Sequence, residues 1–201
     1  MENNHSKILN HFKKHDKIMY AAAQKTGLKV IERKDSTQHF SSLCQAIISQ
    51  QLSWKAADSI FTKFKNLFPR KTITAKHTLT LPLKKLQSCG LSLSKANYIK
   101  DLAEHVENKS LPLNNLHKLS DEEVINLLTQ VKGIGPWTAE MFLMFSLGRE
   151  DVFSHGDLGL RNSLKKLYNL DSDDKVEMQK IAEKWSPYRT YAARVLWDLY
   201  D

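Results

Sequence analysis

Cysteine is scarce in this sequence, and so is any clustering of metal-binding residues. The 201 residues include two cysteines, Cys44 and Cys89. Two thiols are too few for a disulfide framework or a four-cysteine cluster. The eight histidines are scattered, and no group of His, Cys, Asp or Glu has the spacing of a zinc site. Cys44 lies in an apolar stretch, so we expect it in the core.

Long apolar runs and alternating runs are missing as well. The first twenty residues are polar, without the apolar core of a signal peptide, and no stretch approaches the length of a membrane span. There is no internal repeat and no alternating pattern long enough for a sheet. The predicted fold class is therefore all-α, with enough residues for one helical unit of one or two lobes around a real core.

Positive charge is abundant but uneven. The chain has 30 Lys and Arg residues against 22 Asp and Glu, a formal net charge of +8. Between residues 55 and 100 the only acid is Asp58, whereas Lys or Arg stands at 55, 63, 65, 70, 71, 76, 84, 85, 95 and 100. Such a stretch can neutralise phosphates and give salt-sensitive binding to nucleic acid. For most of these lysines individually, a solvated basic face is the alternative.

Apolar spacing predicts helices along most of the chain. The expected ranges are 7–27, 38–50, 53–68, 84–88, 94–106, 158–168 and, for the last helices, 175–200. Ser53 and Ser94 are the expected N-caps of two of them. Residues 27–32 are the expected site of a short extended piece.

A predicted hairpin of two helices is the most informative part of the chain. Residues 120–123 read Ser-Asp-Glu-Glu, a capping box that indicates a helix start. Apolar residues follow at helical spacing as far as Val131. Pro136 suits the first turn of a second helix, and the apolar run 141–145 predicts that this helix is buried. Gly148 is its expected terminator.

The turn of the hairpin contains two glycines one residue apart. Gly133 and Gly135 are expected to break the helix and to permit positive φ, with Lys132 beside them. A phosphate can lie against bare backbone there, facing N–H groups and the positive end of a helix dipole. The alternative is an ordinary helix–turn–helix hairpin with a glycine turn.

Four ordered stretches together resemble a known family. Residues 131–139 followed by Asp157 resemble the helix–hairpin–helix, Gly/Pro-rich loop and aspartate of the DNA glycosylase superfamily. The stretches 46–57, 90–99 and 185–192 resemble segments of its DNA-3-methyladenine glycosylase II family, and the likeness covers roughly residues 40 to 200. The resemblance implies a helix–hairpin–helix glycosylase fold of two helical lobes with the active site between them. We expect one lobe at 40–153, with the hairpin at 122–147, and the other at 1–39 plus 154–201.

The resemblance makes Asp157 the catalytic residue. Loss of a base leaves an oxocarbenium-like sugar, and a fixed carboxylate beside C1′ stabilises it and can orient or deprotonate a water. The alternative role is an N-cap for the helix that begins at Leu158, and Asp157 can serve as both.

Trp137 stands where relatives that also cut the backbone carry a lysine nucleophile. An indole cannot form a Schiff base with C1′, and Lys132 lies before the glycines. We therefore predict a monofunctional enzyme that leaves an abasic site.

The resemblance also places Trp137 and Trp197 in the base pocket, where aromatic faces stack on an electron-poor alkylated purine. Packing inside the protein is the alternative for both.

The predicted pocket is less aromatic than in the resembled family. Met141, Leu158 and Asp198 stand where that family has further tyrosines, so the substrate range is open. The resemblance makes Gln51, with Leu52 adjacent, the wedge that fills the gap left by a flipped base. A polar turn residue is the alternative for Gln51.

No cofactor is expected. The two cysteines exclude the four-cysteine iron–sulfur motif of many endonuclease III relatives. In helix–hairpin–helix proteins a sodium or potassium ion can sit between hairpin carbonyls and a phosphate, here those of Thr129, Val131 and Ile134. His155 lies close to Asp157, and we expect it in a surface loop, with a DNA contact as the alternative.

The predicted function is excision of alkylated purines, such as 3-methyladenine, from duplex DNA in base excision repair. The expected partner is double-stranded DNA with damaged bases, bound by a monomer away from membranes. We expect a cytoplasmic protein, associated with the nucleoid in a bacterium or nuclear in a eukaryote. The alternatives are a non-catalytic helix–hairpin–helix module and an adenine- or uracil-type glycosylase of the same fold.

Overall fold

The chain forms helices joined by short connections. The computed structural model describes residues 4–170 and 174–200, and every regular element in those ranges is helical, which confirms the all-α prediction. The described part divides into two compact units, Lys34–Phe142 and Met1–Arg33 with Leu143–Asp201. We call them the central unit and the terminal unit.

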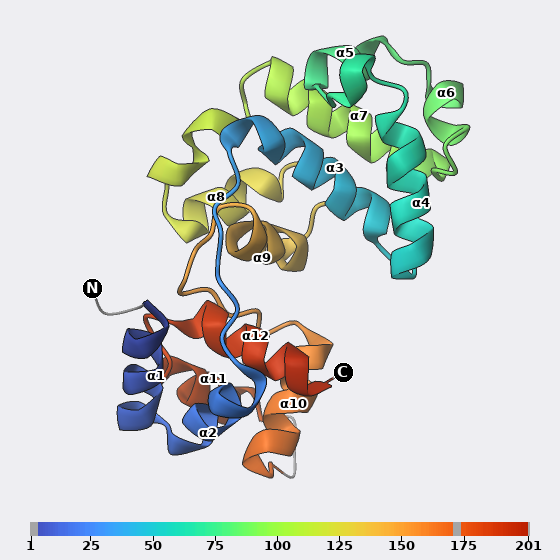
Figure 1. The fold of residues 1–201 in the computed structure, drawn as a ribbon. Helices are drawn as coiled ribbons and strands as arrows, with labels where there is room; N and C mark the ends of the chain where they lie inside the picture. The colour runs from blue at the N-terminus through green and yellow to red at the C-terminus, as the bar shows by residue number, and fades with distance from the viewer. Residues whose placement is uncertain (1–3, 171–173, 201) are drawn as a thin grey trace. The chain divides into compact units, whose positions relative to one another are not determined.

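The central unit contains α3 and its neighbours. Its elements are η1 (Ser36–Gln38), α3 (His39–Ser49), α4 (Trp54–Lys65), η2 (Pro69–Lys71), α5 (Ala75–Thr80), α6 (Leu83–Gln87), α7 (Leu93–Glu107), η3 (Leu113–Lys118), α8 (Asp121–Leu128) and most of α9 (Pro136–Phe145). α3 packs against α4 and α7, and α7 also carries α5 and α6 (Figure 1). Leu43, Cys44, Ile47 and Ile48 form the buried face of α3, so Cys44 is a core residue as expected.

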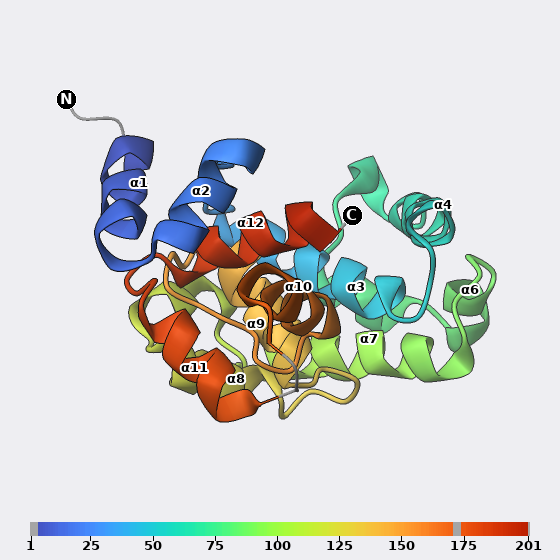
Figure 2. The ribbon, with the colours of Figure 1, turned by 90° about the horizontal axis from the view of Figure 1, so that it is seen from below.

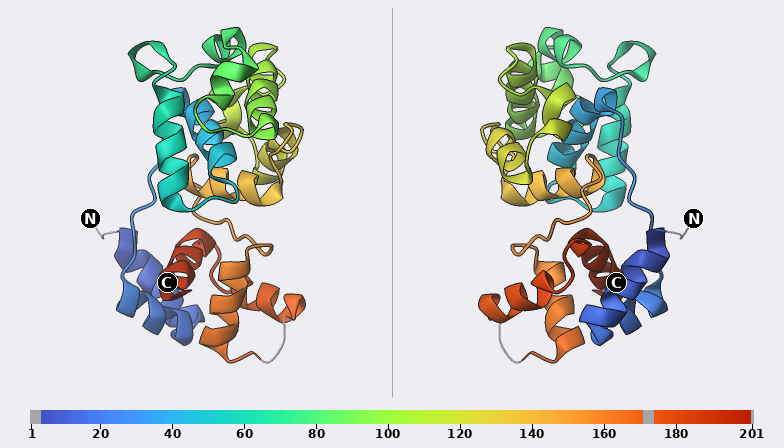
Figure 3. Two further views of the ribbon diagram at one scale, coloured as in Figure 1. Left: turned by 90° about the vertical axis from the view of Figure 1, so that its right-hand side faces the viewer. Right: turned by 90° about the vertical axis from the view of Figure 1, so that its left-hand side faces the viewer.

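The terminal unit is built from both ends of the chain. It contains α1 (Asn4–His15), α2 (Lys17–Thr26), α10 (Leu158–Tyr168), α11 (Lys175–Glu183), α12 (Arg189–Tyr200) and the end of α9. Within this unit α12 lies between α2 and α10 (Figure 2). Figure 3 shows the same order from two sides, with α1 next to α2.

The single helix expected at 7–27 is wrong, because Asp16 divides it. The Asp16 Oδ1 accepts hydrogen bonds from the N–H groups of Ile18 at 3.1 Å and Met19 at 3.0 Å, so it is the N-cap of α2. Its backbone is extended, which ends α1 at His15.

Asp16 is also a tertiary anchor. Its Oδ2 accepts hydrogen bonds from the Tyr168 hydroxyl at 2.6 Å and the Trp185 Nε1–H at 2.9 Å, and only 7% of the residue is exposed. A buried carboxylate with four donors is fully satisfied, so it fixes α2 against α10, which ends at Tyr168, and against the turn after α11 that contains Trp185.

Most helix starts lie where their caps predict. Ser53 caps α4, and Ser120 and Glu123 form the complete capping box of α8. The expected start at Ser94 is wrong by two residues, because Ser92 caps α7 through a 3.2 Å hydrogen bond from the Lys95 N–H. The short elements α5 and η3 were not predicted, since each spans six residues and shows little periodicity.

The expected extended piece at 27–32 is not a strand, since no other segment pairs with it among the described residues.

The predicted burial of α9 is only partly correct. Phe142, Leu143 and Met144 are buried, but Phe145 is 41% exposed. Gly148 has φ +66° and the Arg149 N–H bonds to the Leu143 carbonyl, so this glycine does terminate α9.

The two units differ in their bounds from the lobes expected at 40–153 and at 1–39 plus 154–201. The central unit begins at Lys34 and ends at Phe142, so the end of α9 belongs to the terminal unit. Among the described helices, none has both the length and the apolar character needed to span a bilayer.

Candidate functional site

The predicted hairpin is present as α8, a tight turn and α9. The Ile134 N–H donates to the Val131 carbonyl at 3.1 Å, which closes the turn, and Pro136 is the first residue of α9. Gly133 has φ +82°, in the left-handed region that favours glycine. Gly135 does not have a positive φ, so the expectation of positive φ is wrong for this residue.

The two glycines of the turn have different surroundings. A Cβ on Gly133 would lie 2.2 Å from the ring of Tyr98, so this glycine is required for packing inside the central unit. A Cβ on Gly135 would meet no atom within 4 Å. Among the residues that the structure describes, the N–H groups of Gly133 and Gly135 have no intramolecular acceptor. Gly135 is therefore the position where a phosphate can reach the backbone without obstruction.

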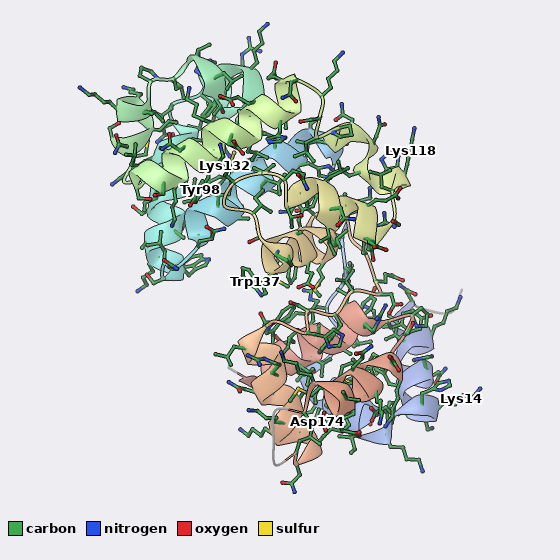
Figure 4. All side chains as sticks on the ribbon, turned by 180° about the vertical axis from the view of Figure 1, so that it is seen from behind. Lys14, Tyr98, Lys118, Lys132, Trp137 and Asp174 are labelled. Carbon is green, nitrogen blue, oxygen red and sulfur yellow. The ribbon has the colours of Figure 1, made fainter. Side chains whose placement is uncertain are left out.

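Lys132 is held by an acidic neighbour. Its backbone N–H donates to the Asp101 Oδ2 at 2.8 Å, and its Nζ lies 3.2 Å from the Asp101 Oδ1. The Lys132 side chain is 75% exposed, so a phosphate that approaches the turn can compete for the ammonium but not easily for the backbone N–H. Figure 4 shows Lys132 and Tyr98 next to each other at this end of the hairpin.

The predicted wedge is an exposed turn between α3 and α4. Gln51 has φ +55°, which is unusual for a residue other than glycine, and Leu52 is 39% exposed. The preceding residue, Gln50, donates from its Nε2 to the Gly133 carbonyl at 2.7 Å. The structure thus brings the wedge turn and the hairpin turn together within the central unit.

The sequence analysis missed Trp54. It is the first residue of α4, directly after the cap Ser53, and 79% of it is exposed. An indole left in water beside the wedge turn is available for contact with a base or sugar. The sequence does contain a signal for Trp54: a tryptophan stands at the first helical position after a predicted turn, where little of it can pack.

Asp157 is the N-cap of α10. Its Oδ1 accepts a hydrogen bond from the Leu160 N–H at 2.8 Å, which confirms the alternative role considered from the sequence. The same oxygen accepts a second hydrogen bond from the Trp197 Nε1–H at 3.2 Å. Two donors fix the direction of the carboxylate, which suits a group that must face a developing charge. Catalysis by Asp157 remains a prediction.

Gly159 lies beside the contact between Trp197 and Asp157. A Cβ at this position would lie 3.2 Å from the Asp157 Oδ1 and 3.5 Å from the indole of Trp197. The indole is further supported by Phe145, whose ring centroid lies 5.8 Å away, and Arg194 lies 5.9 Å from the Phe145 centroid. Trp197 thus uses its N–H to orient Asp157, a function that its assignment to the base pocket did not include.

Trp137 belongs to the central unit, whereas Trp197 and Asp157 belong to the terminal unit. Trp137 is 48% exposed and projects from the first turn of α9 (Figure 4). Its exposure excludes a role as a fully buried core residue. Of the positions that lack tyrosine, Leu158 is 59% exposed and Asp198 forms an ion pair with Lys29.

The hairpin carbonyls proposed for a cation are neutral oxygens, the donor type that sodium and potassium accept. The Val131 carbonyl already accepts the Ile134 N–H and keeps one lone pair for an ion. These donors fit a monovalent cation with Thr129 and Ile134 as further ligands, and the site remains a prediction. No group of three or more His, Cys, Asp or Glu side chains within the described residues is placed to bind a metal.

His155 packs edge-on against Phe153, with ring centroids 5.0 Å apart. Desolvation lowers the pKa of His155, and the nearby Arg189 guanidinium lowers it further. A neutral imidazole at neutral pH supplies no positive charge for a phosphate, so His155 is a weak candidate for an electrostatic DNA contact.

Comparison with known proteins defines the family. Residues 44–187 match the family described as HhH-GPD superfamily base excision DNA repair protein. The chain is 37% identical over 170 residues to DNA-3-methyladenine glycosylase 1 of Schizosaccharomyces pombe, covering 81% of this chain and 73% of that protein. The chain therefore belongs to the HhH-GPD superfamily of base excision DNA repair proteins.

Two solved structures are similar over almost the whole chain. One is the S. pombe 3-methyladenine DNA glycosylase in complex with abasic DNA, with a TM-score of 0.84, 34% identity and coverage of 95% of both chains. The other is a DNA-3-methyladenine glycosidase from Bacillus halodurans, with a TM-score of 0.86, 34% identity and coverage of 99% of this chain and 90% of that one. They confirm the predicted helix–hairpin–helix glycosylase fold.

Proposed function

We propose that this protein is a monofunctional DNA glycosylase that excises alkylated purines, such as 3-methyladenine, from duplex DNA. The observation that carries the proposal is the Asp157 carboxylate, held by the Leu160 N–H and the Trp197 indole in a chain of the HhH-GPD family. DNA-3-methyladenine glycosylases of S. pombe and B. halodurans resemble the chain in sequence and fold.

The proposed reaction is hydrolysis of the N-glycosidic bond. The bond between the base and C1′ breaks, and its electron pair leaves with the purine, which neutralises the positive charge that alkylation placed on the ring. Asp157 stabilises the oxocarbenium-like sugar, and water adds its oxygen to C1′ while its proton passes to Asp157 or solvent. The product is an abasic site.

The residues available at C1′ favour hydrolysis over strand cleavage. Trp137 has no amine, and the ammonium of Lys132 is paired with Asp101. We propose that Gln51 and Leu52 fill the gap in the stack, that Trp54 contacts DNA beside them, and that the backbone at Gly135 holds a phosphate. Trp137 and Trp197 are proposed to face the extruded base, with the protein acting as a monomer in the compartment that holds the chromosome.

The decisive experiment is chromatography of the bases released from methylated duplex DNA. We expect release of 3-methyladenine by the wild-type protein and at least about 10²-fold slower release by Asp157→Asn. DNA binding without release of any base would favour a non-catalytic module. Release confined to uracil or to mispaired adenine would favour another specificity on the same fold.

A further inference from the structure

The segment 90–99 contacts both the wedge turn and the hairpin turn. This segment resembles a helix start of the glycosylase family, and it contains the N-cap Ser92 and the first turns of α7. Three side chains that follow each other at intervals of three residues, Lys95, Tyr98 and Asp101, lie along one strip of this helix. Each of them contacts either the wedge turn or the hairpin turn.

Lys95 holds the end of α3 at the wedge turn. Its Nζ donates to the carbonyl of Ile48 and to the carbonyl of Gln50, both at 2.7 Å. The last carbonyls of a helix have no intrahelical partner, and a cation there is also favoured by the helix dipole. The next residue, Gln51, has φ +55°, a conformation that persists only where its surroundings enforce it.

Tyr98 and Asp101 hold the hairpin turn from the same strip. The Tyr98 ring occupies the space beside Gly133 in which a side chain would collide, 2.2 Å from the position of a Cβ. Asp101 accepts the Lys132 backbone N–H at 2.8 Å. These contacts fix the backbone at Lys132 and Gly133.

The two turns are also joined directly. The Gln50 amide donates to the Gly133 carbonyl at 2.7 Å across 83 residues of sequence. The wedge turn, the hairpin turn and α7 therefore form one closed set of contacts. A displacement of either turn must break hydrogen bonds that are partly buried and costly to leave unpaired.

We propose that Lys95, Tyr98 and Asp101 are positioning residues that hold the wedge at a set distance from the phosphate-binding backbone. This inference rests on the proposed function. Binding of a phosphate at the hairpin then places Gln51 at the base stack without a separate adjustment of the turn. The energy of phosphate binding is thereby used to support the extruded base, whose unstacking and unpairing are otherwise unfavourable.

The test compares Lys95→Met with Lys100→Met. Methionine keeps an unbranched side chain but has no donor. Lys100 is a matched control, since it lies on the same helix, donates to the Leu79 carbonyl at 2.8 Å and, like Lys95, has a pKa lowered by desolvation. Its hydrogen bond reaches α5 and not either turn, so Lys100→Met controls for the loss of an ammonium that binds a backbone carbonyl.

Three quantities are measured for both variants and for Lys95→Arg: affinity for undamaged duplex, unstacking of a 2-aminopurine placed beside the target, and single-turnover excision. We expect Lys95→Met to excise from a paired target about 10- to 100-fold more slowly, the scale of a misplaced group. Its 2-aminopurine signal should fall as well. Undamaged duplex should bind as in Lys100→Met, the defect should shrink for a mispaired target, and Lys95→Arg should recover part of the rate.

The outcomes separate the two proposals. Equal unstacking and excision in Lys95→Met and Lys100→Met, or an equal defect for paired and mispaired targets, would overturn the positioning role. The wild-type protein could unstack the 2-aminopurine without releasing any base, while Lys95→Met does not unstack it. That result would support the positioning role and overturn the glycosylase proposal. No unstacking and no release by the wild-type protein would overturn both.

Discussion

Single residues in this protein combine a structural and a chemical task. Asp157 caps α10 and is also the carboxylate proposed to act at C1′. Gly159 lies next to this carboxylate, where a Cβ would be 3.2 Å from the Asp157 Oδ1. Asp16, in contrast, has only a structural task, because all of its hydrogen bonds lie within the terminal unit. The two tasks of Asp157 can be separated by a substitution that keeps the cap.

Asp157→Asn should separate them. Asparagine caps helices about as well as aspartate, so the melting temperature should change little. Base release should fall at least about 10²-fold, because the charge that stabilises the sugar cation is lost. Calorimetry and single-turnover excision measure the two effects.

Asp174→Asn is the matched control for this substitution. Asp174 caps α11 by accepting the N–H groups of Val176 at 2.9 Å and Glu177 at 3.2 Å, and it has no proposed chemistry. The Asp174→Asn variant should therefore excise the base at the wild-type rate. Full activity of Asp157→Asn would show that Asp157 is a cap alone.

At the scale of elements, the hairpin turn packs against α7 at Gly133 and has open space beside Gly135. Gly133 faces the Tyr98 ring, whereas Gly135 faces open space. The sequence alone does not distinguish the two glycines, since they stand in the same turn one residue apart. Their substitutions should nevertheless have different consequences.

Gly133→Ala should reduce stability, whereas Gly135→Ala should reduce DNA binding. An alanine at 133 requires φ +82° and a displaced Tyr98, which together cost roughly 2–4 kcal/mol. An alanine at 135 fits the fold but places a methyl group where a phosphate approaches, and phosphate contacts carry no sequence information. Its affinity for damaged and undamaged duplex should fall alike. Urea unfolding and duplex titration distinguish the variants, and tight binding by Gly135→Ala would exclude this phosphate site.

At the scale of the whole molecule, the groups proposed to bind DNA and the carboxylate proposed to act at C1′ belong to different units. The basic stretch 55–100, the wedge turn and the hairpin turn all belong to the central unit, and Asp157 with Trp197 belongs to the terminal unit. Two lysines of that stretch, Lys95 and Lys100, bind backbone carbonyls of the protein. They should therefore contribute less than the exposed lysines to the salt dependence of DNA binding.

The reaction type is a property of the whole molecule that one experiment decides. Because the side chain of Trp137, the residue predicted at the nucleophile position, has no amine, no Schiff base with DNA should form. Borohydride should trap no covalent adduct, and strands should break only after heat or alkali. Trp137→Lys is an informative companion variant, and an adduct with the wild-type protein would overturn the monofunctional mechanism.

Residue type and spacing were enough to predict the features that depend on near neighbours. The caps at Ser53, Ser120 and Asp157 involve hydrogen bonds that span three residues, so residue type and spacing predict them. The ordered motifs indicated the HhH-GPD family, because a turn with two glycines followed by an aspartate at a set distance is specific when the other motifs accompany it. The all-α class followed from helical periodicity without alternation.

Contacts between distant segments depend on how the helices pack, and they could not be predicted from the sequence. The links from Gln50 to Gly133, from Trp197 to Asp157 and from Trp185 to Asp16 join residues 83, 40 and 169 positions apart. No local pattern encodes such pairs, since each forms only after helices pack and bring a donor within reach of an acceptor. The same packing gives Gly133 and Gly135 different roles, because a neighbouring ring fills the space beside one and nothing fills the space beside the other.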